Sequence, residues 1–160
     1  MELRLVGSEM CIRDSIRIVT ASKISLKYAL AKFYIIDFAL KGVKDPVHEF
    51  IKRFKKNTSF KVIVNDIKKI RRLNSKFHPI TIKKLGMACS YPGTFNSSIY
   101  TIINSRNYKE AILKTIKAGG CNCSRANFTG AYFAALKGLN SIPNSWIKKT
   151  IPAKKILGQK

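Results

Sequence analysis

Acidic side chains are scarce in this sequence. Its 160 residues include 31 Lys and Arg but 8 Asp and Glu, which gives a formal net charge of +23. A hydrolytic site that relies on paired carboxylates needs two acids with complementary roles. Asp37 lies within an apolar stretch, Glu110 stands at a helix-capping position, and the remaining acids after residue 15 have the pattern of helix starts or surface positions. Such a site therefore cannot be assembled from the five acids after residue 15, which are Asp37, Asp45, Glu49, Asp66 and Glu110.

Cysteine is also rare, and its pattern argues against a disulfide framework. After residue 15 the chain has Cys89, Cys121 and Cys123, an odd number with two of them one residue apart. Such a set suits a reducing compartment, so we expect an intracellular, cytoplasmic protein whose thiols are buried and structural. Two weaker hypotheses stay open: a zinc site that includes Cys121 and Cys123, and a nucleophilic Cys123 beside Arg125.

Long apolar runs are missing. The stretch from Ile24 to Leu40 is interrupted by Lys27, Lys32 and Asp37, whereas a membrane span needs about 20 predominantly apolar residues. The stretch therefore predicts a buried core helix, and we expect no membrane association.

The first fifteen residues do not match the rest of the chain in composition. Residues 10–15 correspond to the codons ATG TGT ATA AGA GAC AG, the mosaic end of transposase-based sequencing libraries, and residues 5–9 correspond to the adapter that precedes it. Segments of this origin are left out of fold reasoning. We expect residues 1–15 to be adapter-derived, with the native chain beginning near Ile16 and its N-terminal part missing.

The remaining sequence has a helical period throughout. Val47, Phe50, Ile51 and Phe54 repeat at the spacing of an amphipathic helix, with Pro46 suited to its first turn. The same spacing recurs in a second row, and a short helix is expected from about Thr81 to Ala88 before the turn at Tyr91-Pro92-Gly93. That second row consists of Phe60, Ile63, Val64, Ile67 and Ile70.

The C-terminal part continues the pattern. Asn107 and Glu110 form a capping box that predicts a helix ending at Gly119. A helix rich in small residues, expected at the centre of the bundle, follows from about Ser124 to Lys137, and Ile142-Pro143 opens a last short helix with Trp146. The pattern contains no strand, repeat or linker. We therefore predict one all-α domain over residues 16–151, followed by a loose basic tail at residues 152–160. The face of the Asn107 helix expected to be buried comprises Tyr108, Ala111, Ile112, Thr115 and Ile116.

The stretch Gly119–Arg125 is the first candidate for chemistry. Its two glycines precede a helix start, so the backbone N–H groups of residues 121–124 can converge on an anion. Asn122, Ser124 and Arg125 add donors suited to phosphate or ribose oxygens. The alternative is a tight turn between helices with capping polar side chains.

Two consecutive segments carry a resemblance. GMACSYPGTFNSSIYTIINSRNYKEAILKTIKAGG and CNCSRANFTGAYFAALKGLNSIPNSWIKKT share their order of motifs with the C-terminal half of the ADP-ribosylglycohydrolase family: a Tyr-Pro-Gly-Thr-Phe turn, a Tyr-x-Glu-Ala-Ile helix, a Gly-Gly loop, a small-residue helix and Ile-Pro-x-x-Trp. The chain is most similar to the branch that includes the jellyfish J-crystallins. The resemblance covers Leu85 to Thr150.

This resemblance implies an orthogonal α-helical bundle. Active members cleave ADP-ribose linkages with a divalent metal, usually Mg²⁺, whose ligands come from N-terminal acidic motifs and from a Gly-Gly-Asp-Thr-Asp-Thr loop. Here Cys121 and Cys123 replace both loop aspartates. Mg²⁺ prefers oxygen ligands, so we expect this fragment alone not to bind it.

The leading hypothesis is a fragment of an ADP-ribosylglycohydrolase-like protein that hydrolyses or binds ADP-ribose-type substrates, with the metal site largely in the missing N-terminal part. One alternative is a non-enzymatic, crystallin-like structural or ligand-binding protein. Catalytic residues and oligomeric state stay unassigned. The predicted substrate-binding residues are Gly119, Gly120, Asn122, Ser124, Arg125, Tyr91 and Phe95.

The positive charge supports a further alternative, a basic helical domain that binds nucleic acid. Without residues 1–15 the chain keeps 29 basic and five acidic side chains. However, Lys, Ile, Asn and Phe have AT-rich codons, so a biased genome also accounts for lysines on solvated helix faces.

Overall fold

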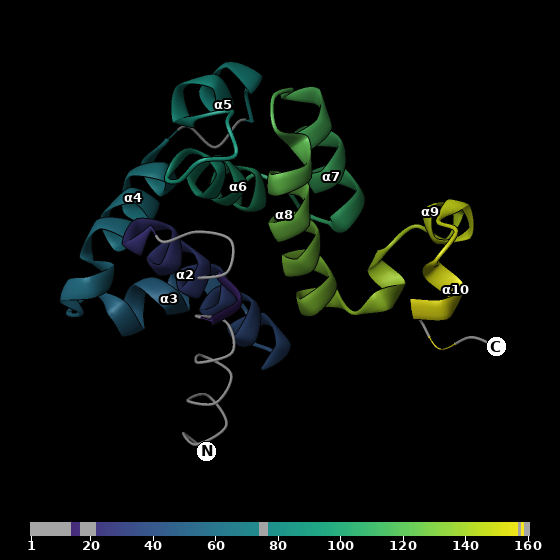
Figure 1. Cartoon of the computed structure of the whole chain (residues 1–160), viewed down its shortest axis with the longest axis horizontal. Helices are drawn as coiled ribbons and strands as arrows, with labels where there is room; N and C mark the ends of the chain where they lie inside the picture. Colours follow the sequence, from purple (N-terminus) through teal and green to yellow (C-terminus); the bar gives the residue numbers. More distant parts are fainter. Residues whose placement is uncertain (1–13, 17–21, 74–76, 157, 159–160) are drawn as a thin grey trace.

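The computed structural model describes residues 14–16, 22–73, 77–156 and 158, and in this part of the chain it contains helices and no strand (Figure 1). The predicted all-α class is confirmed. Residues 1–13 of the expected adapter segment lie outside the described residues. The helices are α2 (Lys23–Leu40), α3 (Pro46–Phe54), α4 (Lys61–Arg72), α5 (Pro79–Leu85), α6 (Gly93–Ile103), α7 (Tyr108–Lys117), α8 (Asn122–Lys137), α9 (Asn144–Lys149) and α10 (Ala153–Ile156), with 3-10 turns at Thr58–Phe60 and Leu139–Ser141.

Side-chain caps set several helix starts. Asp45 accepts a hydrogen bond from the His48 backbone N–H at 2.9 Å, with Pro46 in the first turn of α3. Asn107 accepts from the Glu110 N–H at 2.9 Å and so caps α7 as predicted. Each cap satisfies a backbone donor that has no partner inside the helix.

Helix α8 is the central element, because it packs against α2, α6 and α7. The predicted position is confirmed, but its buried face is not the row of small residues, since Ala131 is exposed. The side chains that face the core belong to larger residues and to one arginine. They are Arg125, Phe128, Thr129, Tyr132 and Phe133, beside Gly130.

The apolar rows of α3 and α4 point into the core as predicted: Phe50 and Ile67 are fully buried. Two other predictions are wrong. Ile116 of α7 is 53% exposed and does not belong to the core. The expected loose tail instead contains α10, whose Ala153 is buried beside α9 (Figure 1).

No helix in the described part of the chain is long and apolar enough to cross a membrane.

Candidate functional site

Two glycines form the turn between α7 and α8. Gly119 and Gly120 have φ of +73° and +69°, a conformation that side chains disfavour. A Cβ atom on Gly120 would lie 2.7 Å from Met87 Cβ and 2.8 Å from its carbonyl oxygen. The same carbonyl accepts a hydrogen bond from the Cys121 N–H at 2.8 Å. The glycines therefore let the loop lie directly against the segment between α5 and α6.

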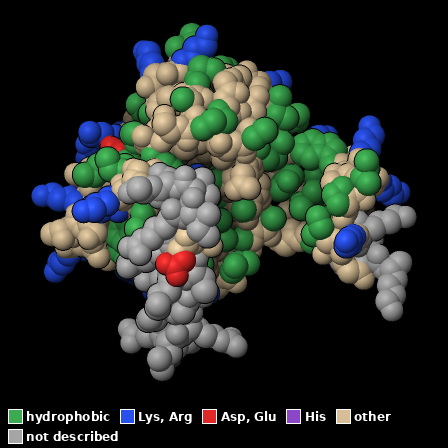
Figure 2. Space-filling model, in the orientation of Figure 1, with side chains coloured by type: hydrophobic (Ala, Val, Ile, Leu, Met, Phe, Trp, Pro, Cys, Tyr) green, Lys and Arg blue, Asp and Glu red, His purple; other side chains and the backbone are tan. Residues whose placement is uncertain are grey.

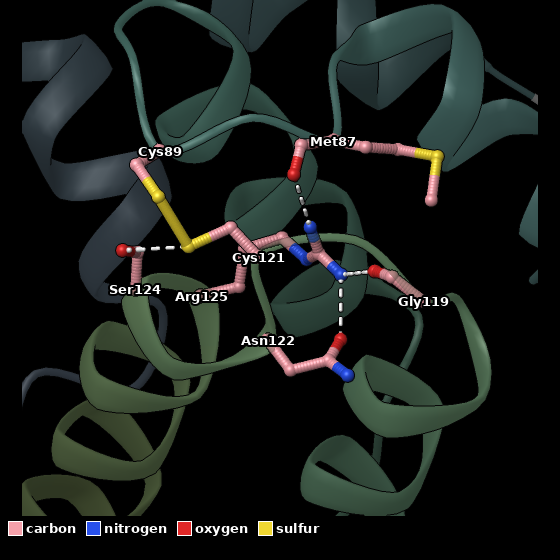
Figure 3. Close-up of a disulfide and its surroundings, with 7 residues drawn as sticks. All are labelled: Met87, Cys89, Gly119, Cys121, Asn122, Ser124 and Arg125. Atoms are coloured by element: carbon pink, nitrogen blue, oxygen red, sulfur yellow. Dashed lines mark hydrogen bonds between the residues drawn. A yellow bond between two sulfur atoms is a disulfide. The ribbon is translucent and has the colours of Figure 1, made fainter.

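Arg125 holds this loop from inside (Figure 3). Its side chain is 0% exposed. Its Nη1 donates to the Met87 carbonyl at 3.2 Å, and its Nη2 donates to Asn122 Oδ1 at 2.9 Å and to the Gly119 carbonyl. Burial lowers the pKa of the guanidinium from its very high usual value, and an arginine remains charged in proteins. Arg125 therefore places a fixed positive charge under the loop, and its donors point inward.

A disulfide joins Cys121 to Cys89, with the two Cα atoms 5.7 Å apart (Figure 3). The prediction of a poor disulfide framework is wrong, because spacing along the chain does not report that Met87 brings the two loops together. The prediction of buried thiols is also wrong: Cys123 is a free thiol and is exposed, and Cys89 is exposed as well. Ser124 Oγ lies 3.2 Å from Cys121 Sγ.

Helix α8 begins without a side-chain cap. Its N-cap residue, Cys121, makes no capping hydrogen bond, and its first turn has no acidic residue. The N–H groups of Cys121 and Asn122 are used by the Met87 and Gly120 carbonyls. Those of Cys123 and Ser124 have no acceptor within the helix. An uncapped helix start over a buried arginine is suited to an anion.

The two aromatic candidates lie differently. Phe95 is 0% exposed, and its ring stacks on Phe128 at 5.9 Å between centroids. Tyr91 is half-buried and stacks on Tyr28 at 5.2 Å. Tyr91 also borders a hollow of about 560 Å³, a size common for small-molecule sites. The hollow is lined by Ser15, Ile16, Ser22, Ile24, Ser25, Ala29, Cys89, Ser90 and Tyr91.

The structure thus brings five predicted residues together and places the other two on neighbouring elements. Gly119, Gly120, Asn122, Ser124 and Arg125 form one loop, and Tyr91 is linked to it through Cys89, two residues away, and its disulfide. Phe95 lies in the core, where its ring packs against Phe128. Substrate binding by all seven stays a prediction.

A sequence profile of the ADP-ribosylglycohydrolase family matches residues 12–157, nearly the whole chain. The chain belongs to the ADP-ribosylglycohydrolase family. It is similar to Crystallin J1A of Tripedalia cystophora, with 38% identity over 69 residues, which is 43% of this chain and 21% of the crystallin. For Crystallin J1B of the same animal the identity is 30% over 76 residues, 48% of this chain and 24% of the crystallin. No solved structure matches the chain significantly.

ADP-ribosylglycohydrolases are generally metal-dependent, but the residues of this loop do not fit Mg²⁺. The sulfur of Cys121 is bonded to Cys89, and a thiol at Cys123 is a soft ligand for a hard cation. Within the described ranges, no group of three or more His, Cys, Asp and Glu side chains is placed to hold a metal ion. We therefore derive no reaction step through a metal in this chain.

Two residues of the site were missed from the sequence. Met87 supplies the carbonyl that both Cys121 and Arg125 use, and Lys32 places its Nζ over the rings of Tyr91 and Phe128. Nothing in the sequence signals the Met87 contact, because it is made by the backbone. Lys32 was visible as a charge within an apolar stretch, a pattern that indicates a constrained lysine.

Proposed function

We propose that this ADP-ribosylglycohydrolase family member binds an ADP-ribose-type ligand, with the ligand's phosphates at the N-terminus of α8. The observation that carries the proposal is the uncapped helix start, with Arg125 buried beneath it and no acid in the first turn. Free N–H groups and the helix dipole both favour a phosphate there. The Asn122 amide is available for further contacts, since its oxygen alone is used by Arg125 (Figure 3).

The base of such a ligand could bind in the hollow beside Tyr91. The hollow beside Tyr91 is bordered by Cys89, the disulfide partner of Cys121. Tyr91 is half-buried and already stacks on Tyr28, so a base would pack against the part of the ring that stays exposed. Burial raises the pKa of its phenol, which keeps the ring neutral. A diphosphate at α8 and a base at Tyr91 would thus lie on two segments that the Cys89–Cys121 disulfide joins.

Hydrolysis is not supported by the described residues. All five acids after residue 15 are engaged elsewhere: four form ion pairs with Lys or Arg, and Asp66 accepts a hydrogen bond from Tyr28 at 3.0 Å. The chain matches only about a quarter or less of the length of the curated crystallins. If the complete protein hydrolyses ADP-ribose linkages, its metal ligands, of which Mg²⁺ is the expected ion, would come from outside the region described here.

The test is calorimetric titration of ADP-ribose into the wild-type chain and Ser124→Glu. A glutamate in the first turn favours the helix by about 0.3–1 kcal/mol, so folding is retained while the new carboxylate repels phosphate. We expect at least a tenfold loss of affinity. Ala131→Glu is the matched control, because it adds the same charge at an exposed position further along α8. Equal affinity of the wild type and Ser124→Glu would remove this helix start from the site.

The similarity to two crystallins favours a second candidate, a non-enzymatic structural role. It predicts a stable protein without measurable ADP-ribose affinity. The intracellular location expected from the cysteines stays a prediction, and the disulfide does not favour it, since cytosolic proteins rarely keep structural disulfides.

Nucleic-acid binding has weaker support. On the face shown in Figure 2, Lys and Arg lie around the periphery over several elements and do not gather in one stripe. A polyanion site of this kind would lose affinity steeply as salt rises, which distinguishes it from recognition of ADP-ribose.

A further inference from the structure

Lys32 lies in the middle of α2 with its ammonium group among aromatic rings. Its Nζ is 4.9 Å from the ring centroid of Tyr91 and 5.3 Å from that of Phe128. A second ring stacks on each of these two rings: Tyr28 on Tyr91, with 5.2 Å between ring centroids, and Phe95 on Phe128, with 5.9 Å between ring centroids. Tyr28 and Phe95 also touch, at 5.2 Å. The four rings form a wall that fixes the position of the amine.

No carboxylate is left to pair with this cation in residues 22–156. The five acids there are bonded to other partners, and neither Tyr91 nor Tyr28 can stand in for one, because burial is the largest cause that raises the pKa of both phenols. The rings alone offer a cation–π attraction. Lys32 is therefore half-buried without an ion pair in the part of the chain that the structure describes. Four of the five acids form ion pairs, which are Asp37–Lys41, Glu49–Arg53, Asp45–Arg71 and Glu110–Lys114.

Desolvation by burial lowers the pKa of the Lys32 ammonium to about 8. A solvated lysine has a pKa of about 10.4, so at neutral pH Lys32 carries far more free amine than its surface counterparts. Desolvated lysines in apolar surroundings are the ones that proteins use as nucleophiles towards carbonyl groups.

We propose that Lys32 is a site of covalent modification, at which a small aldehyde forms an imine with Nζ. The nitrogen lone pair adds to the carbonyl carbon, the carbonyl oxygen takes up the protons released from nitrogen, and one water molecule leaves as the C=N bond forms. Lys32 is half-buried, so its Nζ is still reachable by a small aldehyde, and the nearby hollow meets the ring wall at Tyr91 without being lined by Lys32 itself. The proposal needs no ADP-ribose ligand, although both proposals involve Tyr91 and the hollow beside it.

The test uses glyoxylate with cyanoborohydride, which reduces the imine to a stable secondary amine, at pH 7.5 on the whole chain. Peptide mass spectrometry then gives the initial rate at each lysine. Lys27 is the internal reference, because it lies on the same helix and is exposed. We expect labelling at Lys32 to be about tenfold faster than at Lys27. The difference in pKa alone would give a larger factor, but half-burial slows the access of glyoxylate to Lys32.

The variant Tyr91→Ala removes one ring and lets water reach the amine, so its Lys32 rate should fall to that of Lys27. Equal rates at Lys32 and Lys27 in the wild type would overturn the proposal, and this comparison needs no variant. An unchanged Lys32 rate in folded Tyr91→Ala would also overturn it, since the rings would then not activate the amine.

Discussion

At the scale of single residues, Arg125 has an unexpected role. The sequence presents it as a donor for phosphate, but its guanidinium is buried and joins three parts of the site: the Met87 carbonyl, the Gly119 carbonyl and the Asn122 side chain. Its effect on a ligand is therefore indirect, through its charge and through the shape of the loop. The N–H groups of Cys123 and Ser124, which have no acceptor within the helix, are the donors that remain for a ligand.

Arg125→Ala should weaken both folding and ADP-ribose binding. The substitution removes the guanidinium hydrogen bonds to the Met87, Thr115 and Gly119 carbonyls and to the Asn122 amide oxygen, and hydrogen bonds to a charged group contribute about 1.5–3 kcal/mol each. We expect the free energy of unfolding in urea to fall by about 3 kcal/mol or more. Arg106→Ala, at an exposed arginine, should change it by less than about 0.5 kcal/mol. A loss below about 1 kcal/mol for Arg125→Ala would show that the guanidinium does not hold the loop.

At the scale of elements, the junction between α7 and α8 is connected twice to the segment before α6. One connection is the disulfide Cys89–Cys121. The other consists of the Cys121 N–H and the Arg125 guanidinium, which share the Met87 carbonyl. Because the second connection does not depend on sulfur, we expect the loop to keep its position when the disulfide is reduced.

Reduction of the disulfide should therefore cost stability without unfolding the protein at room temperature. Cross-linking cysteines 32 residues apart contributes about 3–4 kcal/mol in the chain-entropy model. We expect a reductant to lower the midpoint of urea unfolding of the wild type, and Cys89→Ser to show the lower midpoint with or without reductant. Cys123→Ser, which removes the exposed free thiol, should behave like the wild type. Identical midpoints for the oxidised and reduced wild type would contradict the pairing.

At the scale of the whole molecule, charge sets what the bundle can bind. Each of the five acids after residue 15 is already bonded to a basic or phenolic partner. A chain with a net charge of +23 attracts anions and repels cations over its surface. A cation site would need a cluster of carboxylates, which the described residues do not bring together.

Added Mg²⁺ should accordingly leave this chain unaffected. A cation that binds only the folded state raises the melting temperature, and the rise grows with the logarithm of its free concentration once that concentration exceeds the dissociation constant. We expect millimolar Mg²⁺ to shift the thermal midpoint by less than about 1 °C relative to the chelator-treated protein. A rise of about 3 °C, corresponding to roughly 1 kcal/mol for a chain of 160 residues, would show that a metal site exists after all.

The sequence by itself determined the helices and the place of the loop. Apolar residues at helical spacing, Asp45 and Asn107 as caps, and the glycine pair before α8 are local features, and local geometry follows from them. The loop was found in the same way, from its glycines and from the two cysteines at the positions of the family's aspartates.

Only the tertiary structure decided how the loop is used. The pairing of Cys89 with Cys121, the burial of Arg125 and Phe95, and the position of Lys32 over two rings join residues that are far apart in the chain. Periodicity says which face of a helix is apolar, but not which other helix covers it. Those contacts depend on how α2, α6 and α8 pack together, and that packing gives the site its inward-facing arginine and its desolvated lysine.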